Sequence, residues 1–284
     1  MKNIIFILAM VCLLFCCKDK RNENSIVKVK PSTAAENVQI FEEHFEVPQL
    51  KRQRKICVYL PSNYEHVNTR YPVLYILDGQ NIFDDSTSYS GEWEVDETLN
   101  KVYDETGFGL IVIAIDHGGD KRINEYSAWD NEKYGTGEGE NFLKFLTETL
   151  KPKVDHVYRT KTDAKHTAIM GSSIGGLFAH YAAFKAPEVF GKSGVFSPSF
   201  WYAEQCYDLV KENSDLSNSR LYYLIGDKEG EDHIKDMTKM VELIKLKGFS
   251  KLNVVEKIVP NGTHSETIWR AEFEQAIKWL FKIN

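Results

Sequence analysis

Strand-length apolar runs alternate with helical patterns along most of this chain. Residues 73–77, 110–115, 167–170, 193–196, 221–225 and 254–259 are mostly apolar. Such uninterrupted runs are typical of strands covered on both faces, as in parallel sheets. Between them, Phe142, Phe145, Leu146 and Leu150 repeat at helical spacing. With residues 38–47 and 55–60 as an opening antiparallel pair, the pattern predicts one α/β domain, a mostly parallel twisted sheet of about eight strands with helices on both faces.

The composition limits the kinds of molecule that this protein can be expected to bind. The 284 residues are 43% hydrophobic and 27% charged, which excludes a disordered chain, and the formal net charge of −6 argues against nucleic acid as a partner. The histidines show no metal-ligand spacing, and no Walker loop, C-x-x-C or EF-hand pattern occurs. We therefore expect no metal and no cofactor. The sequence leaves the oligomeric state open.

The N-terminus has the layout of an export signal. Lys2 precedes an apolar run over residues 4–15, two cysteines follow, and residues 18–24 are polar. A cysteine closing such a run resembles the lipobox of bacterial lipoproteins. We predict a signal peptide over residues 1–16, lipidation of Cys17, a flexible polar tether over 17–37 and a catalytic domain over 38–284, on an exported lipoprotein of the bacterial cell envelope, at the outer membrane or the periplasmic face. An uncleaved anchor or a plain secretory signal would also fit this layout.

Two cysteines lie in the body of the chain. Cys57 and Cys206 could pair as a disulfide in an oxidising envelope, or each could be a small buried hydrophobe. The apolar alternation around Cys57 favours the second interpretation.

The most specific local motif surrounds Ser173. Residues 171–176 read Gly-Ser-Ser-Ile-Gly-Gly, a G-x-S-x-G directly after a predicted strand and before a predicted helix. In a nucleophile elbow the serine occupies a strained turn, and flanking glycines permit close backbone approach. The motif predicts that Ser173 is a nucleophile, since a mere glycine-rich helix entry would leave the strand context unexplained.

A serine hydroxyl needs a histidine base and an acid that orients the base. His264 follows the last predicted strand in the loop Pro-Asn-Gly-Thr-His-Ser, and we predict that it is the base. After the preceding strand, residues 226–232 offer four carboxylates, Asp227, Glu229, Glu231 and Asp232. The order serine, acid, histidine is that of α/β-hydrolases.

The oxyanion of a tetrahedral intermediate needs two backbone N–H donors. Ile174, the residue after the nucleophile, is one predicted donor, and the loop after residues 73–77 is expected to provide the other. In that loop we assign Gly79, with Gln80 as the second candidate. Residues 124–139 have no apolar period and are predicted to be a loop or lid near the site.

Several segments together resemble one esterase family, which groups esterase D, enterochelin and other siderophore trilactone esterases, and bacterial feruloyl and acetyl-xylan esterases. The matching segments are 71–84, 122–126, 170–177, 196–201 and 262–269. The resemblance implies the α/β-hydrolase fold and places the acid in a Gly-x-x-acid turn, which selects Glu229 over Asp227 and Asp232. It also implies that Gln80 and Trp201 are substrate-pocket residues, against a plain core or rim role.

The resemblance implies a serine esterase that acts through an acyl-enzyme on a small-molecule or glycan-linked ester. A glutamate as the acid of the triad favours siderophore esters as the substrate. Feruloyl or acetyl esters of polysaccharides are the second class of substrate that the family implies. The same scaffold could also serve a non-catalytic binding lipoprotein, and the same triad could serve an acyltransferase.

Overall fold

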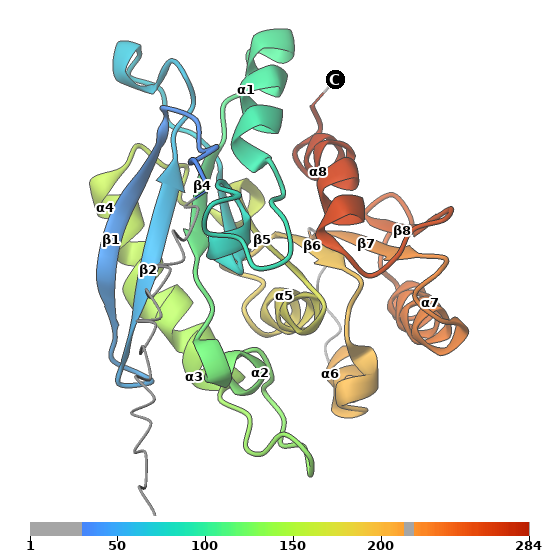
Figure 1. The fold of residues 1–284 in the computed structure, drawn as a ribbon. Helices are drawn as coiled ribbons and strands as arrows, with labels where there is room; N and C mark the ends of the chain where they lie inside the picture. Colours follow the sequence, from blue (N-terminus) through green and yellow to red (C-terminus); the bar gives the residue numbers. More distant parts are fainter. Residues whose placement is uncertain (1–29, 213–218, 284) are drawn as a thin grey trace, which may run out of the picture. The chain divides into compact units, whose positions relative to one another are not determined.

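The computed structural model describes residues 30–212 and 219–283 (Figure 1). The predicted signal peptide, the lipidation site Cys17 and the first part of the predicted tether lie outside these residues. Within them, no helix is long and apolar enough to cross a membrane.

One sheet of eight strands organises the molecule, as predicted. In chain order its strands are β1 (Val38–Val47), β2 (Arg52–Tyr59), β3 (Val73–Leu77), β4 (Ile111–Ile115), β5 (Thr167–Ser172), β6 (Lys192–Phe196), β7 (Arg220–Gly226) and β8 (Val254–Val259). Their order across the sheet is β1-β2-β4-β3-β5-β6-β7-β8. The pairs β1·β2 and β2·β4 are antiparallel and all the others are parallel.

Helices cover both faces of the sheet (Figure 1). They are α1 (Val95–Thr106), α2 (Arg122–Glu125), α3 (Gly139–Lys144), α4 (Lys151–Val157), α5 (Ile174–Lys185), α6 (Gln205–Glu212), α7 (Glu231–Leu246) and α8 (Glu266–Phe281). A π-helical turn, Phe145–Leu150, joins α3 to α4, so this whole stretch is helical, as its apolar spacing predicts.

Alternate residues of the central strands enter two separate cores. From β3, Val73, Tyr75 and Leu77 pack with α3 to α7. Leu74 and Ile76 of the same strand pack on the other face with α1 and α8. Every residue of β3 and β4 is buried, because both faces of the sheet are covered, and this explains their uninterrupted apolar sequences.

The segment before β1 is held against the body of the domain. Ser32 Oγ donates to Asp84 at 2.6 Å, Thr33 Oγ1 donates to Glu92 at 2.8 Å, and the backbone N–H of Ala35 donates to Asp96 at 2.7 Å. The sequence pattern assigned residues 17–37 to a flexible tether. In the structure, residues 31–37 are instead part of the compact unit that begins at Pro31, because their polar atoms find partners on the body.

Both body cysteines are free thiols. The disulfide hypothesis is therefore wrong. Cys206 is buried in the larger core, as expected of a small hydrophobe, whereas Cys57 is half-buried. Burial raises the pKa of the Cys57 thiol to about 11, so this thiol is unreactive at neutral pH.

Candidate active site

Ser173 occupies the sharp turn between β5 and α5. Its φ of +60° is unusual for a residue with a side chain, and its N–H donates to Phe196 O at 2.9 Å. A Cβ at Gly176 would meet Phe196 O at 2.7 Å, and one at Gly171 would meet Gly175 O at 2.5 Å. The nearest atom to a Cβ at Gly175 lies 3.4 Å away, an ordinary contact. The strained elbow therefore depends on Gly171 and Gly176 more than on Gly175.

Glu229 and His264 are brought together by the loops after β7 and β8. Glu229 Oε2 lies 2.7 Å from His264 Nδ1. The glutamate side chain is 1% exposed and the histidine side chain 44% exposed. A buried carboxylate thus holds a histidine that is open to solvent, the arrangement that a triad requires.

The buried carboxylate of Glu229 has two further donors. The N–H of Gly226 and the hydroxyl of Ser197 each donate to Oε1 at 2.7 Å. Ser197 in turn accepts the indole N–H of Trp269 at 2.9 Å. Burial alone would raise the pKa of Glu229, but hydrogen bonds from His264, Gly226 and Ser197 outweigh it and the pKa lies below its ordinary value. An ionised Glu229 accepts the Nδ1 proton of His264 and leaves Nε2 free to act as a base.

The other acids after β7 lie elsewhere. The Asp232 side chain is 95% exposed and faces Lys235 at 3.5 Å, while Asp227 faces Lys228 at 3.7 Å. His233 lies in the first turn of α7. Among the carboxylates of this loop, Glu229 is therefore the one that contacts His264.

Two hollows are each lined by both Ser173 and His264. One, of about 490 Å³, also has Tyr134, Ser199 and Trp201 in its wall. The other, of about 250 Å³, is also lined by residues that include Tyr89, His117, Arg122 and Glu266. The Ser173 hydroxyl faces Ser199 Oγ at 3.4 Å. Among the described residues, no hydrogen bond joins Ser173 to His264.

The loop after β3 borders the smaller hollow. Gln80 lines this hollow, whereas Gly79 packs against the end of β4, where an added Cβ would meet Asp116 N at 2.8 Å. Of the two residues predicted as the second oxyanion donor, Gln80 is the one whose position borders the site. The Gln80 side chain accepts the N–H of His117 at 3.4 Å.

An ion pair beside this loop was not anticipated from the sequence. Arg122 donates from Nε and Nη2 to the two oxygens of Asp78 at 2.6 and 2.8 Å. Burial would lower the pKa of Arg122, but the adjacent Asp78 carboxylate more than offsets this and raises it. Asp78 adopts φ of +59°, so the bidentate pair holds the turn that presents Gln80.

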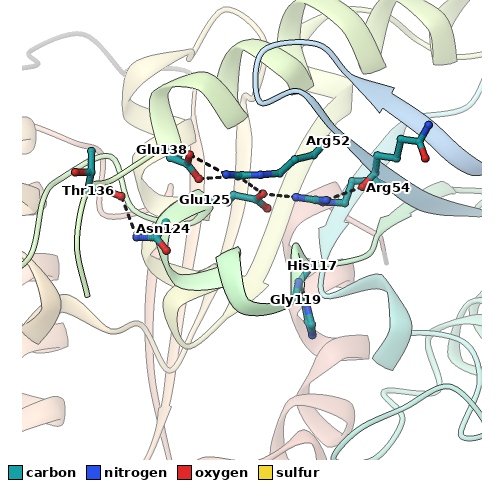
Figure 2. A network of polar contacts seen from close by, with 9 residues as sticks. Arg52, Arg54, His117, Gly119, Asn124, Glu125, Thr136 and Glu138 are labelled. Carbon is teal, nitrogen blue, oxygen red and sulfur yellow. Dashed lines mark hydrogen bonds and ion pairs between the residues drawn. The ribbon is translucent and has the colours of Figure 1, made fainter. Parts of the chain in front are cut away.

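The predicted loop over residues 124–139 is anchored at both ends (Figure 2). Arg52 of β2 contacts Glu125 and Glu138 at 2.6 Å each, and Arg54 also pairs with Glu125. At its tip, the Asn131 side chain donates to Tyr202 O at 2.9 Å. The loop thus carries Tyr134 to the wall of the larger hollow, as a fixed element and not as a free lid.

Among the described residues, one group of acids could hold a metal, and none of its members lines the two hollows. Glu92, Asp96 and Glu97 each bring a carboxylate oxygen within 4.8 Å of the others. Burial raises the pKa of Asp96 to about 8 and that of Glu92 to about 6. A proton on Asp96 would reduce the repulsion among these carboxylates.

Trp201 lines the larger hollow beside Ser173 and His264, in agreement with its predicted place in the substrate pocket. Its side chain is half exposed at the mouth of the larger hollow and meets Tyr134 edge to face, with ring centroids 6.4 Å apart. Ser197 and Trp269, which support Glu229, belong to segments that resemble the esterase family, but neither residue was assigned an individual role from the sequence.

Comparison with known proteins agrees with the fold and the site. A family model described as "Putative esterase" matches residues 48–280. A Bacillus subtilis protein, "Uncharacterized protein YbbA", is 24% identical over 81% of this chain and 94% of its own length. An "Endo-1,4-beta-xylanase/feruloyl esterase" of Xylanibacter ruminicola is 27% identical over 79% of this chain but only 29% of its own. The enterobactin esterase FES of Shigella flexneri superimposes with a TM-score of 0.68 at 19% identity, over 89% of this chain and 59% of that one.

An eight-stranded α/β sheet with a serine at the elbow after β5 defines a hydrolase-type scaffold. Because the family model covers most of the chain, the protein belongs to the esterase family and is an esterase. The predicted fold class, family and ester-cleaving activity are thereby confirmed.

Proposed function

We propose that the protein hydrolyses carboxylic esters through an acyl-enzyme on Ser173, with His264 as base and Glu229 as the orienting acid. The observation that carries the proposal is the 2.7 Å contact between His264 and the buried Glu229, in a wall of the hollows that Ser173 also lines. This geometry fixes the imidazole with Nε2 available to a serine hydroxyl.

In the first step, Ser173 Oγ attacks the ester carbonyl while its proton passes to His264 Nε2. The oxyanion is held by the N–H of Ile174 and a second N–H in the loop after β3, for which we propose Gln80 in preference to Gly79. Collapse of the tetrahedral intermediate breaks the bond to the alcohol, which leaves with the proton from His264. Water then attacks the acyl-enzyme, with His264 accepting its proton, and releases the acid. No cofactor enters these steps.

The wall of the larger hollow supports an ester that carries an aromatic ring. Trp201 and Tyr134 present apolar rings beside Ser173 and His264, and an exposed tryptophan at a pocket mouth can stack on a flat ligand. We propose a siderophore trilactone whose aromatic groups lie against this wall, since we assign Glu229 as the acid of the triad and the fold resembles that of an enterobactin esterase.

A feruloyl ester of a polysaccharide is the second candidate. It is favoured by the relative whose name includes feruloyl esterase, which aligns over 79% of this chain. Offering an iron-loaded catecholate trilactone and methyl ferulate in parallel separates the two. Cleavage of ferulate alone would reject the siderophore ester.

Hydrolysis of p-nitrophenyl acetate tests the mechanism. We expect the parent protein to hydrolyse it and Ser173→Ala to lose most of the activity, with Ser199→Ala as the matched control because its hydroxyl faces the same hollow. Equal rates in the parent and Ser173→Ala would refute the triad and support a non-catalytic role. Product analysis with added alcohol distinguishes hydrolysis from acyl transfer.

We further propose that the chain is an exported lipoprotein anchored through Cys17, on the basis of its N-terminal sequence pattern. Mass spectrometry of the mature N-terminus tests this. The parent is expected to begin at a lipidated cysteine, and Cys17→Ser is expected to lack the lipid. An unchanged lipidated product from the variant would exclude Cys17 as the acceptor.

A further inference from the structure

A basic hollow lies at the amino ends of the central strands. It has a volume of about 490 Å³, and its wall contains the basic residues Lys161, Lys165, His166, Lys192, Arg220 and Lys282. Among the described residues that line it, none is acidic. Five full cations around one cavity are unexpected in a chain whose net charge is −6.

The strands themselves place these charges. Lys192 is the first residue of β6, Arg220 is the first residue of β7, and His166 directly precedes β5. Ser173 directly follows the opposite end of β5. The basic hollow and the proposed catalytic serine therefore lie at opposite edges of the same parallel strands.

Lys192 is the most enclosed of the cations. Its side chain is nearly buried, at 8% exposure for the residue, and its ammonium lies 5.4 Å from the centroid of the Phe281 ring. Burial, followed by the charges of Arg220 and Lys282, lowers the pKa of Lys192 to about 8. A buried ammonium surrounded by like charges is costly unless an anion shares the site.

The remaining cations are also short of acidic partners. Asp163, the carboxylate beside the hollow, contacts His166 at 2.8 Å. Arg220 donates from Nη2 to Trp279 O at 2.8 Å, but its buried Nε has no partner among the described residues. Within the described part of the chain, no carboxylate forms an ion pair with Lys161, Lys165 or Lys282.

We infer that this hollow binds a phosphate group, carried by a soluble phosphorylated compound or by a lipid headgroup. A phosphate offers several acceptor oxygens and up to two negative charges, which match a cavity with many N–H donors and no acid in its wall. The buried Lys192 and the Arg220 guanidinium form the floor for the anion, and the exposed Lys161, Lys165 and Lys282 supply the field that attracts it.

Calorimetric titration of the full chain with inorganic pyrophosphate tests the site. We expect saturable binding to the parent, weakened at least about tenfold in Lys192→Met and in the double variant Lys161→Gln/Lys165→Gln, because each variant removes positive charge from the wall of the hollow. Lys153→Gln, an exposed lysine outside the hollow, is the control and is expected to bind as the parent does. The double variant alters only exposed side chains and keeps the test valid if Lys192→Met fails to fold.

Two further arms identify the source of the phosphate. Phosphatidylcholine vesicles with and without phosphatidylglycerol are compared, so that a lipid anchor contributes equally to both. A preference for the anionic vesicles that pyrophosphate abolishes would support a headgroup ligand, and pyrophosphate binding without that preference would support a soluble one. Hydrolysis of p-nitrophenyl acetate is expected to be unchanged in all these variants. Equal pyrophosphate affinity of the parent and the double variant, or an equal loss in Lys153→Gln, would overturn the proposal.

Discussion

The two edges of the parallel strands hold their charges in opposite ways. At the carboxyl edge, two buried carboxylates have basic partners: Glu229 contacts His264 and Asp78 contacts Arg122. At the amino edge, Lys192 and its neighbours surround a hollow without an acid in its wall. Paired charges fix side chains in one geometry, which chemistry at a serine requires. Several charges of one sign without acidic partners attract an anion from solution.

The largest effect is expected from breaking a pair at the carboxyl edge. Glu229→Gln removes the negative charge that holds His264, and we expect kcat to fall by about 10³- to 10⁴-fold. Asp232→Asn, at a side chain that is 95% exposed, is the matched control and should retain the parent rate. Steady-state kinetics on p-nitrophenyl acetate measures both. A comparable loss in Asp232→Asn would contradict the assignment of the acid.

The rigidity of the carboxyl edge can be tested through its glycines. Gly176→Ala forces a Cβ to within 2.7 Å of Phe196 O, so β6 and α5 must separate, and we expect a loss of about 2–4 kcal/mol in the free energy of unfolding. Gly175→Ala meets its nearest atom at 3.4 Å and is expected to cost less than about 1 kcal/mol. Chemical denaturation of both variants gives the comparison. Equal losses in the two variants would show that close contact between Gly176 and β6 does not restrict the residue type at this turn.

Asp96 tests the difference between paired and unpaired charges, because it is a buried acid without a cationic partner among the described residues. Its pKa of about 8 lies well above the ordinary value of 3.8. Between these values the folded protein keeps a proton that the unfolded chain releases, so stability is greatest at low pH and falls as pH rises toward 8. We expect a contribution on the order of 1–3 kcal/mol, which Asp96→Asn should remove. Measuring the free energy of unfolding of both proteins at pH 5 and pH 8 tests this. If Asp96→Asn loses as much stability between the two pH values as the parent does, the account of Asp96 is refuted.

The smallest effect concerns the aromatic wall beside the serine. Trp201→Ala is expected to raise KM for an aromatic ester by about threefold to tenfold, because stacking contributes about 0.5–1.5 kcal/mol. Trp201→Phe should restore most of the affinity. Kinetics on methyl ferulate and on ethyl acetate separate stacking from a general defect. A similar rise in KM for both esters would contradict the stacking role.

Local patterns in the sequence predicted most of the fold. The uninterrupted apolar runs of β3 and β4 predicted a sheet covered on both faces, and the glycines around Ser173 predicted the turn between strand and helix. Both signals arise within a few neighbouring residues, where backbone conformation and burial constrain the amino acids directly.

Features built from distant residues were not predictable in the same way. Lys161, Lys192, Arg220 and Lys282 become neighbours only because parallel strands begin at one edge. The hydrogen bonds of residues 31–37 depend on acids that α1 and its preceding loop present, so a polar segment predicted to be a tether is packed instead. The orientation of Gly79 and Gln80 depends on contact with the end of β4, which the loop sequence alone does not specify.

The most direct test of the proposed catalytic role is to trap the nucleophile. Incubation with a fluorophosphonate followed by peptide mass spectrometry should place a single label on Ser173, and Glu229→Gln should slow the labelling because His264 loses its orientation. Ser172 and Ser199, which lie beside Ser173 in the structure, provide internal controls that should remain unlabelled. A label on either of them, or no label on the active parent enzyme, would contradict the account.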